Sequence, residues 1–178
     1  EPIRHAWAAL KIGLLGEPAA GAILGKNGAS FTAEEFQAPE TNIDFAQELS
    51  ITKTAIEALG AKLLPVIIPD KSRMMSYELP RPRSARFEER YENLLEELRA
   101  QNLPVIDLRS TLAKSGSFMV TDTHWSPQGA YRSALVISDY ATENITSHSK
   151  FELSQGPIKE FEGDLIAFAE TGMWRAFA

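Results

Sequence analysis

The sequence predicts an α/β fold with a central parallel sheet, and three observations lead to this class. A continuous apolar run bounded by prolines, Lys62–Pro69, is typical of a strand buried on both faces. A strongly amphipathic helix follows over Arg83–Gln101, and a second short strand over Pro104–Leu108. This order predicts parallel strands joined by a crossover. We therefore expect ligands beyond the carboxyl ends of the strands, where Asp70 and Asp107 fall.

The segments before the first of these strands predict two helices and a turn. Helical spacing of apolar residues indicates a first helix over Ile3–Leu15, and Lys26–Gly28 has turn chemistry, after which Phe31 begins a short strand. Asn42 is the expected N-cap of a second helix, which stops at Gly60. This helix is expected to turn eight apolar residues inward: Ile43, Phe45, Ala46, Leu49, Ile51, Ala55, Ile56 and Leu59.

The last predicted helix starts at Ser126 and Pro127, which supply an N-cap and a first-turn proline. Five of its residues are available for packing: Ala130, Leu135, Val136, Ile137 and Tyr140. The sequence Asp-Thr-His-Trp, residues 122–125, precedes this helix and is expected to form a loop at its start.

Length and composition indicate one globular domain over residues 1–178, because no Pro-, Gly- or Ser-rich linker divides the chain. A net charge of −6 without a dense basic block argues against nucleic acid as a partner. The sequence contains no cysteine, which excludes disulfides and thiolate chemistry. The apolar stretch Ile12–Leu24 is interrupted and too short to span a membrane. The chain opens on Glu1 rather than Met, which is compatible with an export signal or anchor removed before this numbering, so the absence of one here is uninformative.

Asp122 and His124 are the candidate acid–base pair. Residues two positions apart in an extended loop point the same way, so the carboxylate can reach the imidazole ring. A carboxylate bonded to one ring nitrogen leaves the other as a base, as nucleophilic acyl transfer requires. The alternative is a structural loop, in which Asp122 caps a turn and His124 packs on Trp125. We expect no metal, because no second histidine lies close in sequence.

The block Asp122–Ala130 resembles the Asp-Thr-His-Trp block of the SGNH-like polysaccharide O-acetyltransferases, the alginate acetylation proteins of the AlgJ and AlgX type. Three further segments are similar in order and character: Gly25–Gly28, Pro69–Pro80 and Gly163–Leu165. The resemblance covers most of the chain, although only the histidine block is highly specific.

This resemblance implies an SGNH hydrolase-like, flavodoxin-like domain with a circularly permuted motif order, and a Ser-His-Asp triad. Asp122 would orient His124, and His124 would deprotonate first a serine and then a sugar hydroxyl. In the family the serine follows the histidine in a Gly-Thr-Ser type block, and no such block follows His124 here. We therefore expect the domain to be incomplete at its C-terminus, with the serine beyond Ala178.

The resemblance also implies a place of action and partners. It predicts an enzyme of the periplasm, held at the inner membrane by a segment outside this sequence, that acetylates a bacterial exopolysaccharide, with alginate the first candidate. The implied partners are a membrane acyltransferase and other polysaccharide-secretion proteins, and no cofactor is implied. An acetyl esterase of the same fold and a non-catalytic polysaccharide-binding subunit are the alternatives.

Three residues are candidates for binding the substrate. Lys71 and Arg73 follow the first predicted strand, where cations would attract an acidic sugar, although such residues are often merely solvated. Trp125 either stacks on a sugar ring or braces the histidine loop by burying a large apolar area.

Overall fold

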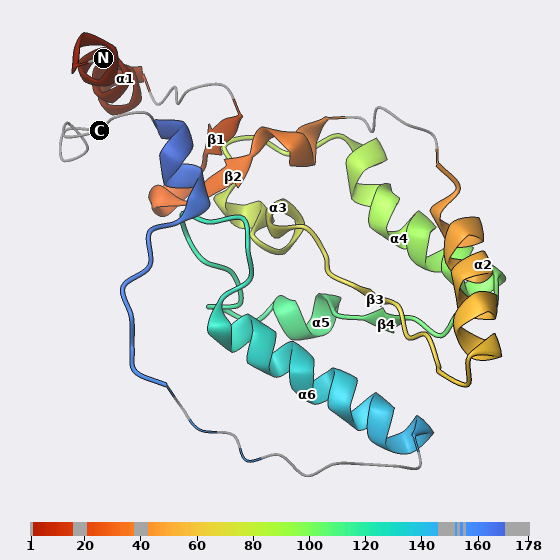
Figure 1. Ribbon diagram of the computed structural model, residues 1–178. Coiled ribbons are helices and arrows are strands. Elements are labelled where there is room, and N and C mark those ends of the chain that lie inside the picture. Colours follow the sequence, from red (N-terminus) through yellow and green to blue (C-terminus); the bar gives the residue numbers. More distant parts are fainter. Residues whose placement is uncertain are drawn as a thin grey trace.

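The computed structural model describes residues 2–15, 21–37, 43–145, 152, 154 and 156–169 (Figure 1). Six α-helices are formed in these ranges: α1 Pro2–Leu15, α2 Phe45–Ala58, α3 Lys71–Met74, α4 Ala85–Ala100, α5 Arg109–Leu112 and α6 Pro127–Asn144. The strands there are β1 Ala22–Leu24, β2 Ser30–Thr32, β3 Val66–Ile67 and β4 Ile106–Asp107. Short 3-10 helices complete the described chain: η1 Lys26–Gly28, η2 Ala33–Phe36, η3 Ser76–Glu78 and η4 Asp164–Ala169.

The two central strands, β3 and β4, are parallel, as the strand–helix–strand order predicts. Val66 lies opposite Ile106, and the next residue of each strand continues the register. The paired segment is short because Pro65 and Pro69 bracket it, and proline has no N–H to donate to a neighbouring strand. The prediction of a strand buried on both faces is wrong, since Val66 is only half-buried and the adjacent Ile68 is 48% exposed.

Helices pack on both sides of these strands, α5 and α6 on one side and α2 and α4 on the other (Figure 1). The first side holds a buried cluster formed by Ile106, Leu108, Leu112 and Phe118. The second side holds Ala46 of α2, Leu98 of α4 and Leu103. The amphipathic helix predicted over Arg83–Gln101 is thus confirmed as α4, which buries Tyr91, Leu95 and Leu98.

Helix α2 ends as predicted but buries fewer residues than expected. Gly60 adopts the left-handed conformation at φ 79° and donates its N–H to the carbonyl of Glu57, so the helix stops there. The N-cap is Asp44, whose carboxylate accepts the N–H of Gln47 at 2.9 Å; the predicted cap, Asn42, lies outside the described residues.

Only part of the predicted apolar face of α2 packs inward. Ala46 is buried and Leu49 packs beside it, whereas Phe45, Ile51 and Leu59 are 46%, 58% and 86% exposed. A helix of 3.6 residues per turn cannot place eight such closely spaced residues on one face.

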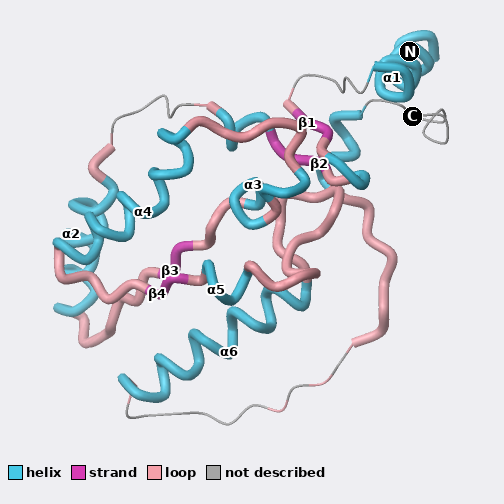
Figure 2. Tube along the Cα trace, turned by 180° about the vertical axis from the view of Figure 1, so that it is seen from behind, coloured by secondary structure: helices cyan, strands magenta, loops and turns pink. Residues whose placement is uncertain are grey.

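A second small sheet brings the two ends of the described chain together. Strands β1 and β2 are antiparallel around a turn in which Asn27 and Gly28 have φ 53° and 77°, as their turn chemistry predicts. The last described helix, η4, contacts both strands, as the view from behind shows (Figure 2). The segment that follows α6 therefore returns to the N-terminal part of the molecule.

Helix α6 begins as predicted, with the Ser126 hydroxyl accepting the N–H of Gly129 at 3.0 Å. Of its five predicted packing residues, Val136, Ile137 and Tyr140 pack on the core, but Leu135 is 48% exposed. None of the described helices combines the length and apolar character that crossing a membrane requires.

Candidate active site

The loop that carries Asp-Thr-His-Trp is a closed hairpin between α5 and α6. Ser126 donates its N–H to the carbonyl of Ser117 at 2.8 Å, and Phe118 and Trp125 form an antiparallel bridge. Trp125 also packs against the core cluster of Phe118 and Leu112. The loop is therefore anchored at its base, between the end of α5 and the start of α6.

Asp122 and His124 are in contact, as their spacing predicts. The Asp122 Oδ1 atom lies 2.7 Å from His124 Nδ1 and also accepts the backbone N–H of His124 at 2.8 Å. Because an ionised carboxylate only accepts hydrogen bonds, the neutral imidazole carries its proton on Nδ1. The other nitrogen, Nε2, is then unprotonated and available as a base.

The two members of this pair differ sharply in exposure. The side chain of Asp122 is 1% exposed, whereas that of His124 is 69% exposed. Burial alone would raise the pKa of Asp122, but hydrogen bonds from the backbone N–H groups of His124 and Asp164 and from the His124 ring outweigh it and hold the pKa below its usual value. The buried carboxylate thus stays ionised and orients a ring that faces solvent.

Asp164, at the start of η4, is a member of the site that the sequence reasoning did not identify. Its backbone N–H donates to Asp122 Oδ2 at 2.8 Å. Its own carboxylate accepts the N–H of Thr123 at 2.8 Å and the Thr123 hydroxyl, and lies 3.6 Å from His124 Nδ1. The available signal was the segment Gly163–Leu165, which carries part of the family resemblance but suggested no role.

Gly163 allows this close approach. A Cβ atom at this position would overlap the carbonyl oxygen of Thr121, which is the residue before Asp122. The same carbonyl accepts the N–H of Leu165 at 3.2 Å, so the two backbones are in direct contact. A glycine is therefore required where η4 meets the site loop.

The exposed ring of His124 borders a hollow of about 210 Å³ beside α3. Its lining consists of Glu35, Ile68, Pro69, Asp70, Lys71, Phe118, Thr123, His124 and Trp125. Among the described residues, no side chain bonds Nε2, so a hydroxyl could approach that nitrogen. A larger hollow of about 430 Å³ lies between α2 and α4, but its lining contains no histidine and thus no comparable base.

A cation is a second possible use of the same groups. Asp122, His124 and Asp164 each offer a ligand atom, and these atoms lie within 4.8 Å of one another. Both oxygens of Asp122, however, already accept N–H groups. A cation would have to displace the Nδ1 proton, so the arrangement fits an orienting carboxylate better than a metal ligand.

The predictions that Lys71 and Arg73 face a bound sugar are not supported, because both side chains turn inward. Lys71 is 1% exposed, and its ammonium donates to backbone carbonyls. Arg73 donates to the carbonyls of Phe87 and Glu88 at 2.8 and 2.7 Å, which ties α3 to the start of α4. Position after a strand does not by itself determine where a long side chain points.

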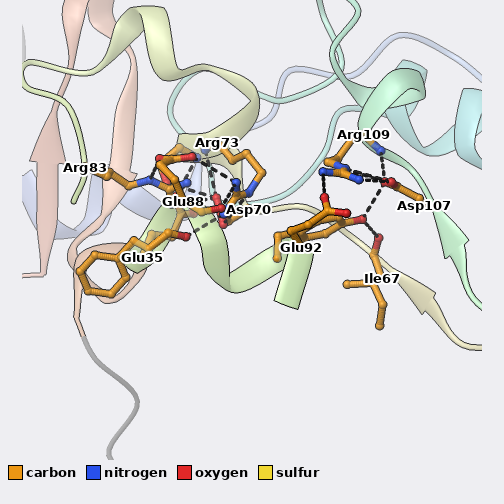
Figure 3. Close-up of polar contacts among 12 residues, drawn as sticks. Glu35, Ile67, Asp70, Arg73, Arg83, Glu88, Glu92, Asp107 and Arg109 are labelled. Atoms are coloured by element: carbon orange, nitrogen blue, oxygen red, sulfur yellow. Dashed lines mark hydrogen bonds and ion pairs between the residues drawn. The ribbon is translucent and has the colours of Figure 1, made fainter. Parts of the chain in front are cut away.

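The two aspartates expected at the sheet edge also have structural partners, as Figure 3 shows. Asp70 caps α3 and accepts Arg83 at 2.8 Å. Asp107 binds Arg109 and accepts the Tyr91 hydroxyl at 3.2 Å. Trp125 does line the hollow, and it also packs on the core, so its role in stacking on a sugar stays a prediction.

Comparison with known proteins identifies the family. Residues 22–177 match the family described as SGNH hydrolase-like domain, acetyltransferase AlgX. The chain belongs to this family. A solved structure of the O-acetyltransferase domain of Pseudomonas putida AlgJ superposes with a TM-score of 0.68 at 22% identity, over 83% of this chain and 58% of that one. Pseudomonas aeruginosa AlgX superposes with a TM-score of 0.55 at 16% identity, over 68% of this chain and 32% of that one. The predicted SGNH hydrolase-like fold is therefore confirmed.

Curated relatives of this chain carry the name probable alginate O-acetylase AlgJ. A probable alginate O-acetylase AlgJ from Pseudomonas aeruginosa is 29% identical over 176 residues, which cover 91% of this chain and 44% of the relative. The corresponding protein of Azotobacter vinelandii is 32% identical over 133 residues, covering 70% of this chain and 34% of the relative. The chain thus spans less than half the length of these relatives.

Proposed function

We propose that the Asp122–His124 pair serves the transfer of acetyl groups to hydroxyls of a bacterial exopolysaccharide, with alginate the first candidate. One observation carries the proposal: a buried carboxylate bonds Nδ1 of an exposed ring that borders a hollow, which leaves Nε2 as the unprotonated nitrogen. The names of the curated relatives, probable alginate O-acetylase, support the acetyl group and the polymer.

In the proposed reaction, His124 Nε2 takes the proton of a serine hydroxyl as the serine attacks an acetyl ester, and the imidazolium then gives this proton to the leaving group. Nε2 next deprotonates the sugar hydroxyl, which attacks the acetyl-serine, and the serine regains its proton. No serine among the described residues bonds the His124 ring. We therefore propose that the serine comes from a segment outside the described residues.

The location and the partners of the protein are also proposals, and they rest on the family resemblance. We infer a periplasmic enzyme, anchored at the inner membrane, that receives acetyl groups from a membrane acyltransferase and works with other polysaccharide-secretion proteins. The resemblance of the Asp122–Ala130 block supports these inferences.

Acetyl transfer is tested with a chromogenic acetyl ester, with and without an oligosaccharide acceptor, on this chain and on any longer product of its gene. Removing a general base lowers the rate of a reaction about 10²–10⁴-fold. The rate of acetyl transfer should therefore fall at least about 10²-fold in His124→Ala and stay unchanged in His5→Ala. Ester released only to water would favour the esterase, and binding of the oligosaccharide without turnover in any form would favour the non-catalytic subunit. Unchanged turnover in a folded His124→Ala variant would contradict the proposed base.

A further inference from the structure

Lys71 is a buried cation whose hydrogen bonds all go to the backbone. It is 1% exposed, and its Nζ atom donates to the carbonyls of Ser30, Val120 and Asp122 at 2.6, 2.8 and 2.9 Å. An ammonium group has three N–H donors, so each donor has one acceptor. The side chain is therefore fully committed to three points of the backbone.

These three carbonyls belong to two segments that meet at the site. Val120 and Asp122 both lie in the site loop, and their carbonyls converge on the ammonium of Lys71. Ser30 lies in β2, and its N–H also donates to the carbonyl of Val120 at 2.9 Å. Lys71 thus joins α3, β2 and the loop that carries Asp122, with its ammonium 5.3 Å from the centre of the Phe31 ring.

The helix from which Lys71 extends is itself fixed by a charged cluster, shown in Figure 3. Asp70 accepts the N–H of Arg73 at 3.0 Å, which caps α3, and also accepts Arg83 at 2.8 Å. Arg83 is 1% exposed at its side chain and donates to Glu88 of α4 at 2.7 Å. Contacts therefore run without interruption from α4 through Asp70 to Lys71 and on to Asp122.

The contacts of Asp122 show what this arrangement determines. Its carbonyl is held by Lys71, while its carboxylate must meet His124 Nδ1 on one oxygen and the N–H of Asp164 on the other. Both carboxylate contacts depend on the position and direction of the Asp122 backbone. An ammonium that fixes this backbone from the interior also fixes the carboxylate relative to the ring.

We propose that Lys71 is a positioning residue, which holds the backbone of Asp122 so that the carboxylate keeps His124 in the tautomer protonated on Nδ1. Burial lowers the pKa of Lys71 to about 8, and the nearby carboxylates of Glu35, Asp122 and Asp164 oppose this shift. The ammonium form, with all three donors, therefore predominates at neutral pH. The importance of this role for catalysis rests on the proposed function, whereas its effect on the tautomer of His124 is independent of that function.

The test is the tautomer of His124 in Lys71→Met, which keeps the length of the side chain but removes its donors and charge. Nitrogen-15 NMR of the histidine-labelled chain reports which ring nitrogen carries the proton, and the spectrum of His124→Ala assigns the signal. When the carboxylate that bonds Nδ1 is no longer held in place, the ring proton distributes between Nδ1 and Nε2. The Nδ1–H population should therefore fall at least about twofold in folded Lys71→Met. Lys62→Met is the matched control, since Lys62 donates to the carbonyl of Asn144 at the far end of α6.

A folded Lys71→Met protein with the wild-type tautomer would overturn the proposal and leave Lys71 as a purely structural group. If this variant does not fold, Lys71→Gln, which keeps an N–H donor in the buried space, is held to the same criterion. The readout needs no turnover, so it separates the two proposals: a changed tautomer, with no acetyl transfer in this chain or in any longer product of its gene, supports the positioning role and contradicts the function. In an active form, kcat should fall about tenfold or more while KM changes by less than about twofold, because the buried ammonium donates all its hydrogen bonds to the backbone.

Discussion

The backbone N–H of Asp164 donates to the carboxylate of Asp122 at 2.8 Å, across 42 positions of sequence. The same residue holds Thr123 with its own carboxylate. The histidine loop is thus braced by a segment that follows α6, and its geometry depends on that segment as well as on the motif.

Substituting Asp164 should loosen the loop. In Asp164→Ala the N–H and hydroxyl of Thr123 lose their acceptor, while the backbone bond to Asp122 remains. A hydrogen bond to a charged group is worth about 1.5–3 kcal/mol, and the 40% exposure of Asp164 places these bonds below that range. We expect faster hydrogen exchange at the Thr123 amide and, if the proposed function holds, a lower rate of acetyl transfer in a form that includes the serine. Asp139→Ala, on the exposed face of α6, is the control, and equal exchange in the two variants would contradict the brace.

A methyl group at Gly163 should destabilise the protein. The Cβ of Gly163→Ala would overlap the carbonyl of Thr121, so η4 or the site loop must move. Overpacking of this kind typically costs about 1–3 kcal/mol, which urea denaturation can measure. Gly156→Ala is the matched control, because a Cβ at that position meets no atom within 4 Å. Equal stability of the two variants would show that the backbones at Gly163 and Thr121 are not in tight contact.

Removing Arg83 should be costly because its partners stay behind. Arg83→Met removes one of the two cations that Asp70 and Glu88 share, because Arg73 also pairs with both carboxylates. Leaving a buried charge unpaired costs about 3–5 kcal/mol, and the loss here should be smaller, because Arg73 remains paired with both carboxylates and Glu88 is 42% exposed. Thermal unfolding should show a lower midpoint for Arg83→Met and little change for Arg81→Met, because Arg81 is exposed. A small fall in both would mean that the cluster adds little to stability.

Acid should remove the contribution of Asp122 to stability. Its pKa in the folded chain lies below the usual 3.8, so the unfolded chain binds the proton more readily. The contribution is therefore present above about pH 4 and is lost as the pH falls through the lower folded pKa. Urea unfolding should show the advantage of wild type over Asp122→Asn shrinking below pH 4. A difference that stays constant from pH 7 to pH 3 would contradict the pKa shift.

Glu35 titrates in the opposite sense and must be separated from this effect. Burial raises its pKa, so its contribution is present at low pH and is lost as the pH rises through the folded pKa. Both proteins in the comparison contain Glu35, and its contribution cancels in their difference. The test thus reports on Asp122 alone.

Local signals in the sequence predicted local structure well. The caps and turns at Asn27, Gly60 and Ser126 were confirmed because each depends only on neighbouring residues. The contact between Asp122 and His124 follows from their spacing in the same way, while their role in catalysis stays a prediction.

Features that depend on distant parts of the chain could not be predicted in this way. The direction of the Lys71 side chain is set by carbonyls 41, 49 and 51 positions away. The role of Asp164 likewise depends on how the segment after α6 returns. A pattern of charge or hydrophobicity does not show which distant segments will meet, so it predicts neither contact. For the same reason it did not show which apolar residues of α2 would stay exposed.

The long span between Asp122 and Asp164 also sets an order of assembly during synthesis. A ribosome completes the Asp-Thr-His-Trp motif, β2 and α3 well before it adds the residue that closes the site, and N-terminal parts fold first during synthesis. Until that residue emerges, one oxygen of Asp122 lacks its N–H donor. A chain cut between residues 145 and 163 would therefore contain the whole histidine motif and still present an unfinished site.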